Sequence, residues 1–131
     1  MIINVYWDKN YSAIPANDEM AVAVTGKTLD EIKERMEFSL QRHVASMQTD
    51  GDPIPAEFQG EYELEYHLDA LALLHYTEGI VSRKALAQVT GINQQQLSHY
   101  ARGWRKPRPE MQKRIEAGIH ELGQQLLAVS M

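Results

Sequence analysis

Three short stretches near the beginning of the chain have the apolar spacing that strands require. Within residues 3–7 every second position is apolar, the pattern of a strand with one buried face. A polar cluster at residues 8–10 predicts a turn, after which residues 11–14 are expected to return as a second strand. After a further polar break, the apolar run of residues 20–24 predicts a third strand.

The spacing of the apolar residues then lengthens to that of a helix. Thr28-Leu29-Asp30-Glu31 is a capping box, in which the Thr and Glu side chains bind free amides at a helix start. Asp50-Gly51-Asp52-Pro53 is expected to end this helix. The apolar stripe between the two motifs consists of Leu29, Ile32, Met36, Leu40, Val44 and Met47.

A fourth strand is predicted over residues 62–68. Its Tyr and Leu residues alternate with Glu61, Glu63, Glu65 and His67, so one face would be buried and the other acidic. The order of elements is then β-β-β-α-β, which indicates an α+β domain. An acidic strand face is most often a solvated surface, and the alternative is a binding site for a basic partner.

The second half of the chain has the spacing of two short helices joined by a tight turn. Ser82 is an N-cap for the first helix, Gly91 supplies the left-handed residue that ends it, and Asn93 caps the second. This is the pattern of a helix-turn-helix, whose second helix enters the major groove of DNA. The alternative is a three-helix core with a polar surface that binds no DNA. The residues expected in the core are Ala85, Leu86, Val89, Ile92, Leu97 and Tyr100.

The polar residues of the second helix have the chemistry of DNA contacts. Gln94, Gln95 and Gln96 open this helix, and the first residues of a recognition helix face base edges. A Gln amide carries a donor and an acceptor that match N6 and N7 of adenine. The positions expected to continue the contact face, through the helix end and the proline-containing segment beyond it, are Ser98, His99, Arg102, Arg105, Lys106 and Arg108.

The charge distribution supports a DNA partner for this half. Residues 82–114 hold eight Lys and Arg against one carboxylate, a net charge of +7, which is the footprint expected of a nucleic-acid-binding surface. Residues 1–68 carry a net charge of −8 and residues 69–131 a net charge of +3. The opposite signs predict two domains with these bounds, one for DNA and the other for a basic partner.

The composition excludes several other kinds of function and site. The chain has 131 residues, 44% hydrophobic, and no cysteine, so it can build a packed core but neither a disulfide nor a thiolate metal site. It contains no leader pattern and no apolar run of membrane length, so a cytoplasmic protein is expected. The five histidines lack zinc-ligand spacing, and Gly26-Lys27-Thr28 lacks the first glycine of a phosphate-binding loop. No metal or cofactor is therefore expected.

Three motifs in the first domain occur in a set order. They are Asp8-Lys9-Asn10-Tyr11-Ser12-Ala13, Gly26-Lys27-Thr28-Leu29-Asp30-Glu31 and the more specific Asp50-Gly51-Asp52-Pro53-Ile54-Pro55. With the second-half pattern, they give nearly the whole chain a resemblance to HicB-type antitoxins. Two features depart from the family: the glycine pair of the first turn is missing, and Pro15-Ala16-Asn17-Asp18 replaces a Pro-Asp-Leu-Pro-Gly segment.

The resemblance implies two linked functions. The first domain would have a partial ribonuclease H-like fold without its activity and would mask a small basic RNA-cleaving toxin of HicA type. Glu61, Glu63 and Glu65 are the candidate toxin contacts. The second domain would be a helix-turn-helix of the phage-repressor (Xre/Cro) type that represses its own operon. Carried over by position, this motif assigns base reading to Gln94, Gln95 and His99 and a phosphate contact to Arg83.

Residues 109–129 are expected to form a long terminal helix with Pro109 in its first turn. Its apolar residues form a seam compatible with a homodimer or higher homo-oligomer, which would bind an inverted-repeat operator. The alternative is that the seam packs on its own helix-turn-helix, and in so small a domain part of it must. The seam consists of Met111, Ile115, Ile119, Leu122, Leu126 and Val129.

Two other functions remain open from the sequence. A free-standing repressor, whose first domain senses a small molecule or another protein, would share the DNA-binding half. A nuclease of ribonuclease H type would need clustered carboxylates and a divalent metal. Asp8 lies at a strand end, but no second carboxylate can be assigned beside it from the sequence.

Overall fold

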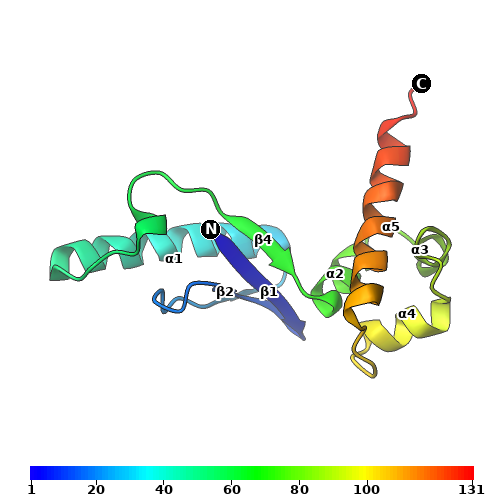
Figure 1. The fold of residues 1–131 in the computed structure, drawn as a ribbon, viewed down its shortest axis with the longest axis horizontal. Coiled ribbons are helices and arrows are strands. Elements are labelled where there is room, and N and C mark those ends of the chain that lie inside the picture. The colour runs from blue at the N-terminus through cyan, green and yellow to red at the C-terminus, as the bar shows by residue number, and fades with distance from the viewer. The chain divides into compact units, whose positions relative to one another are not determined.

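A computed structural model describes all 131 residues and contains a four-stranded sheet and five α-helices (Figure 1). The expected α+β class is confirmed. The chain divides into two units, Met1–Ala72 and Leu73–Met131, which we call the N-terminal and C-terminal units. The division falls inside a helix, Ala70–Glu78, that was not predicted, whereas the domain boundary expected from the charge distribution follows Leu68.

The sheet of the N-terminal unit has the strand order β3-β2-β1-β4. Its strands are β1 (Ile2–Asp8), β2 (Asn10–Pro15), β3 (Val24–Gly26) and β4 (Glu65–Leu68). β1 and β2 form an antiparallel hairpin that turns at Lys9, β3 pairs antiparallel with β2, and β4 pairs parallel with β1. The parallel pair is possible because a long helix carries the chain from β3 to the opposite edge of the sheet.

That helix, α1 (Leu29–Asp50), packs against the sheet (Figure 1). Its predicted cap is confirmed, since Thr28 Oγ1 accepts a hydrogen bond from the Glu31 amide at 3.1 Å. Glu31 Oε2 in turn accepts from the Lys27 amide at 2.9 Å, so the capping box closes one residue earlier than its usual form. The fully buried side chains that form the centre of the core come from the sheet and the helix: Ile3, Val5, Ala13, Ile32, Met36 and Leu40.

The third strand was predicted at residues 20–24, and this position is wrong. The Met20 amide donates to Asn17 O at 3.1 Å and the Val22 amide donates to Met20 O at 2.9 Å. These local hydrogen bonds fold the segment into turns, so only Val24–Gly26 is left to pair with β2. The apolar residue Met20 is nevertheless buried in the core, which explains why the run is apolar.

The fourth strand is also shorter than the predicted residues 62–68. β1 starts at Ile2, which pairs with Glu65, so residues 62–64 lie beyond the end of the strand that would pair with them. The predicted alternation is confirmed for burial, because Tyr62 and Leu64 pack on the core while the glutamates between them are exposed. A short 3₁₀ turn at Ala56–Phe58, which buries Phe58, was not predicted.

The C-terminal unit is helical. Its helices are α2 (Ala70–Glu78), which begins in the N-terminal unit, α3 (Arg83–Thr90), α4 (Gln94–Ala101) and α5 (Pro109–Leu127). The buried side chains shared by these helices are Leu74, Leu86, Ile92, Leu97, Tyr100 and Ile115. No helix in either unit combines the length and apolar character that crossing a bilayer requires.

Candidate nucleic-acid interface

The turn between α3 and α4 is built from the predicted capping residues. Ser82 Oγ accepts a hydrogen bond from the Ala85 amide at 3.0 Å and thereby caps α3. Gly91 ends α3 with a φ of 71°, and its amide donates to Ala87 O at 2.9 Å. Asn93 Oδ1 accepts from the Gln96 amide at 2.8 Å and starts α4. These local contacts fix where each helix begins and ends.

Buried contacts lock α4 against the rest of the unit. Leu97 and Tyr100 are at most 4% exposed, and Ile92, in the turn, is 3% exposed. Gln96 Nε2 donates to Tyr100 Oη at 2.6 Å, so this glutamine is already engaged within α4. The outer face of α4 is therefore held at a defined angle to the core.

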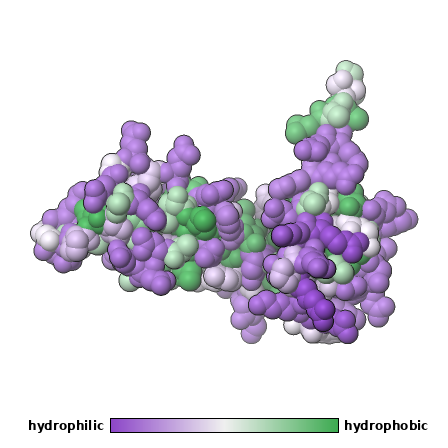
Figure 2. Space-filling model, in the orientation of Figure 1, coloured by the Kyte–Doolittle hydropathy of each residue, from purple (hydrophilic) through white to green (hydrophobic).

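Most residues expected to contact DNA come together on α4 and the segment after it. Gln94 and Gln95 are exposed in the first turn of α4, while Ser98 and His99 are half-buried further along. The basic residues beyond the helix are all exposed: Arg102, Arg105, Lys106 and Arg108. Figure 2 shows the most hydrophilic atoms of the visible face gathered in this unit, around the beginning of α5.

Arg83, which the resemblance placed at a phosphate, is held within the unit instead. Its guanidinium donates to Leu97 O at 3.0 Å and to Glu78 Oε1 at 3.3 Å, and its side chain is only 19% exposed. Leu97 belongs to α4, so Arg83 ties α3 to α4. The charge of Arg83 is partly neutralised by Glu78, which makes it a weaker candidate for DNA than the other arginines.

The segment after α4 folds back on the last turn of that helix. Gly103 turns the chain with a φ of 76°, and the amides of Trp104 and Arg105 donate to His99 O at 2.9 and 3.4 Å. The Arg102 guanidinium carbon lies 4.9 Å from the centre of the Trp104 ring. The His99 and Trp104 ring centres are 5.5 Å apart, with an interplanar angle of 41°.

Trp104 was missed by the sequence analysis. Its indole is 66% exposed although it is among the largest apolar side chains of the unit. A tryptophan directly after a helix-ending glycine, between Arg102 and Arg105, was the available signal, because large aromatics without a core position are common at binding surfaces.

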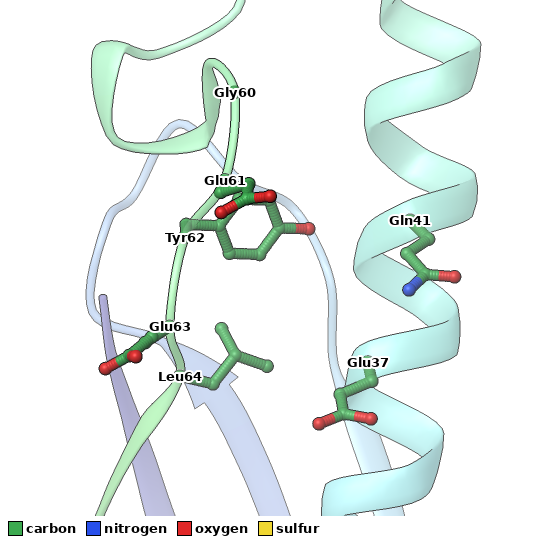
Figure 3. A pocket seen from close by; sticks show the side chains of 7 residues that line it. All are labelled: Glu37, Gln41, Gly60, Glu61, Tyr62, Glu63 and Leu64. Atoms are coloured by element: carbon green, nitrogen blue, oxygen red, sulfur yellow. The ribbon is translucent and has the colours of Figure 1, made fainter.

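The acidic face of the N-terminal unit lies on the approach to β4. Glu61, Glu63 and Glu65 are exposed, and Glu65 Oε1 lies 3.5 Å from His67 Nε2. A groove of about 960 Å³ runs between α1 and residues 60–64. Figure 3 shows Tyr62 and Leu64 directed toward α1 and Glu63 directed away from it. The groove thus has an apolar floor and is flanked by carboxylates, including Glu37 of α1.

Tyr66, on β4, has a clearly displaced pKa. Burial raises the pKa of Tyr66 to about 12, and the nearby Glu37 carboxylate adds to the effect by disfavouring a second negative charge. The hydroxyl donates to Lys33 O on α1 at 3.4 Å, and Lys33 Nζ lies 5.6 Å from the ring centre. The side chain therefore joins β4 to α1 in its neutral form.

The apolar seam of α5 is divided between two environments. Met111, Ile115 and Ile119 pack on the core of their own unit, as the local-packing alternative required. Leu126 and Val129 are 62% and 72% exposed, and Figure 2 shows apolar atoms at this end of the chain. α5 ends at Leu127 rather than at the predicted residue 129, because Ala128 is its C-cap.

Comparison of the chain with protein-family models, with curated proteins and with solved structures found no match. No three His, Asp or Glu side chains are grouped closely enough to hold a metal ion. The candidate surfaces are therefore interpreted from their own geometry and charge.

Proposed function

We propose that the chain is an antitoxin that represses its own operon. In this proposal α3 and α4 form a helix-turn-helix that binds operator DNA, and the N-terminal unit binds a small basic RNA-cleaving toxin of HicA type. The supporting observation for DNA binding is the capped start of α4, where Gln94 and Gln95 are exposed ahead of a run of exposed basic residues. No carboxylate occurs between residues 79 and 109 to oppose a phosphate backbone.

Each residue of the interface has a distinct role in this proposal. Gln94, Gln95 and His99 read base edges, because Gln94 and Gln95 are exposed and His99 is partly exposed on the helix that would enter the major groove. Ser98, Arg102, Arg105 and Lys106 bind phosphates and set the register of the protein on the duplex. Arg83 is left out of the contact set, since its guanidinium is bound to Leu97 and Glu78.

The exposed end of α5 supports a two-fold dimer. Leu126 and Val129 of the seam are left uncovered by its own core, and together with the exposed neighbouring residue Leu127 they are available to a second copy of the chain. A symmetric dimer would place two α4 helices on an inverted repeat with half-sites about 34–36 Å apart, or a multiple of that spacing.

Support for toxin binding comes from the N-terminal unit. Its strand order and parallel β1–β4 pair are compatible with the partial ribonuclease H-like fold that we propose for it. Glu61 and Glu63 line the groove and Glu65 is exposed at the start of β4, so this surface offers a basic partner both charge and contact area. A toxin that grips RNA must present such a basic surface.

The DNA-binding part is tested by replacing one base-reading and one phosphate-binding residue in the full chain. Gln95→Ala should weaken the free energy of binding to an operator by about 1 to 3 kcal/mol and relax the sequence preference at one base pair. Arg105→Ala should weaken binding to all sequences and reduce the salt slope by about one unit. Gln124→Ala, an exposed glutamine on α5, is the matched control and should change neither. Equal losses on operator and random DNA for Gln95→Ala would reject this recognition face.

The antitoxin part is tested by RNA cleavage with the partner that co-purifies with the full chain. Replacing Glu61, Glu63 and Glu65 together by Gln should slow association and weaken inhibition, while leaving DNA binding intact. The matched control neutralises three other exposed carboxylates of the same unit: Asp18, Glu19 and Glu34. If the chain binds DNA but inhibits no ribonuclease, the proposal gives way to a free-standing repressor with an unknown signal.

A further inference from the structure

Trp104 has an environment that neither packing nor folding of its own unit explains. Two thirds of its surface is exposed, and it does not belong to the buried cluster of the C-terminal unit. Its backbone amide is bonded to His99 O, so the loop conformation is held without the indole. A large aromatic side chain that is kept in water at a fixed position is typical of a binding contact.

The neighbours of Trp104 are residues of the proposed DNA interface. The Arg102 guanidinium lies 4.9 Å from the ring centre, and the His99 ring centre is 5.5 Å away. Stacking on an indole restricts the rotamers of an arginine and directs its N–H donors outward in the ring plane. Trp104 can therefore hold both side chains in the orientation in which they meet DNA.

The chemistry of the indole suits the sugar–phosphate backbone. Trp104 is 66% exposed, so the ring has surface available to pack on an apolar deoxyribose, and an indole N–H is a donor that a phosphate oxygen accepts. Arg105 and Lys106 follow directly in the chain and are exposed, so the local charge also favours a polyanion.

We propose that Trp104 is a DNA-contacting residue that packs on the sugar–phosphate backbone beside α4 and holds Arg102 against the adjoining phosphate. This inference rests on the proposed DNA binding by the C-terminal unit. Because the contact is to the backbone, Trp104 contributes to binding of every sequence. It does not choose between bases.

The first experiment uses Trp104 as its own reporter. In the Trp7→Phe background it is the only tryptophan of the full chain. Titration with a mixed-sequence duplex of about three helical turns should shift or quench its emission and protect it from acrylamide. If the duplex binds by fluorescence anisotropy of a DNA label while the Trp104 signal stays unchanged, the contact does not exist.

The second experiment measures the energetic link to Arg102. Trp104→Ala should weaken binding to the same duplex about tenfold and make the salt slope shallower by about one unit, because Arg102 loses its orientation. Arg102→Ala should reproduce the change in slope, and the double variant should fall short of the sum of the two losses. Trp104→Phe, which keeps a ring, should retain part of the affinity. Tyr76→Ala, another exposed aromatic of this unit, should bind normally.

The outcomes distinguish a failure of the role of Trp104 from a failure of the proposed DNA binding. Normal duplex affinity in Trp104→Ala, or strict additivity with Arg102→Ala, would overturn the role of Trp104 and leave DNA binding standing. Loss of affinity together with loss of helical circular dichroism would mean that Trp104 supports only the fold. Failure of the wild-type chain to bind any duplex would overturn the proposed DNA binding and this inference with it.

Discussion

Gly118 lies where α5 crosses the end of α3, and replacing it tests how closely the two helices are packed. A Cβ atom added to Gly118 would lie 2.7 Å from Thr90 Cγ2 and 3.0 Å from Val89 O. Carbon atoms in ordinary contact are about 3.5–4.0 Å apart, so either Thr90 or the backbone of α3 must move.

Thr90 cannot turn its methyl group aside without loss. Its Oγ1 donates to Leu86 O at 2.8 Å and accepts from the Ile92 amide at 3.2 Å, and the residue is 6% exposed. A rotation about χ1 would break both buried hydrogen bonds. The strain in Gly118→Ala therefore falls on the spacing between α3 and α5.

The expected magnitude is a balance of two terms. Overpacking a close contact costs about 1 to 3 kcal/mol, whereas Ala in place of Gly within a helix returns about 1 kcal/mol. We expect Gly118→Ala to destabilise the C-terminal unit by up to about 2 kcal/mol. Gly123→Ala is the matched control on the same helix, because nothing lies within 4 Å of its added Cβ. That variant should be stabilised by up to about 1 kcal/mol.

The difference in unfolding free energy between the two variants isolates the cost of overpacking, because both variants gain the same helix propensity. Native-state hydrogen exchange of the Leu97 and Ile115 amides in the full chain reports the opening free energy of this unit alone. A difference of about 1 to 3 kcal/mol appears as exchange that is about 5- to 150-fold faster in Gly118→Ala. Equal stabilisation in both variants would show that α3 and α5 separate freely, and the packing argument would be wrong.

Two further predictions concern the pH response and the oligomeric state. The pKa of Tyr66 is about 12 in the folded chain and near its ordinary value of 10 when unfolded, so its contribution to stability is complete below pH 10 and is lost as the pH rises toward 12. Urea midpoints of the N-terminal unit should therefore fall more steeply over this range than those of Tyr66→Phe, and parallel curves would contradict the assignment. Leu126→Glu combined with Leu127→Glu should convert a dimer to a monomer in sedimentation equilibrium without unfolding, because both side chains are exposed. A double variant that remains dimeric would place the interface elsewhere.

The sequence alone determined the features that depend on neighbouring residues. The sequence predicted the helix caps at Thr28, Ser82 and Asn93 and the left-handed Gly91. The hydrogen bonds that start or end a helix join residues only a few positions apart, so neighbouring residues determine them. The apolar stripe of α1 was likewise readable, since helical spacing defines its buried face without reference to a partner.

The tertiary structure decided the features that depend on distant residues. The lengths of β3 and β4 follow from where β2 and β1 can pair with them, which apolar alternation cannot reveal. Arg83 and Gln96 look like free polar residues in the sequence, yet Arg83 binds Leu97 O and Gln96 binds Tyr100 Oη. Conversely, the exposure of Trp104 beside Arg102 emerges only once the core is complete without it. The sequence determines the chemistry of each side chain, but whether that side chain is free to contact a partner depends on the hydrogen bonds and packing that it makes within the folded chain.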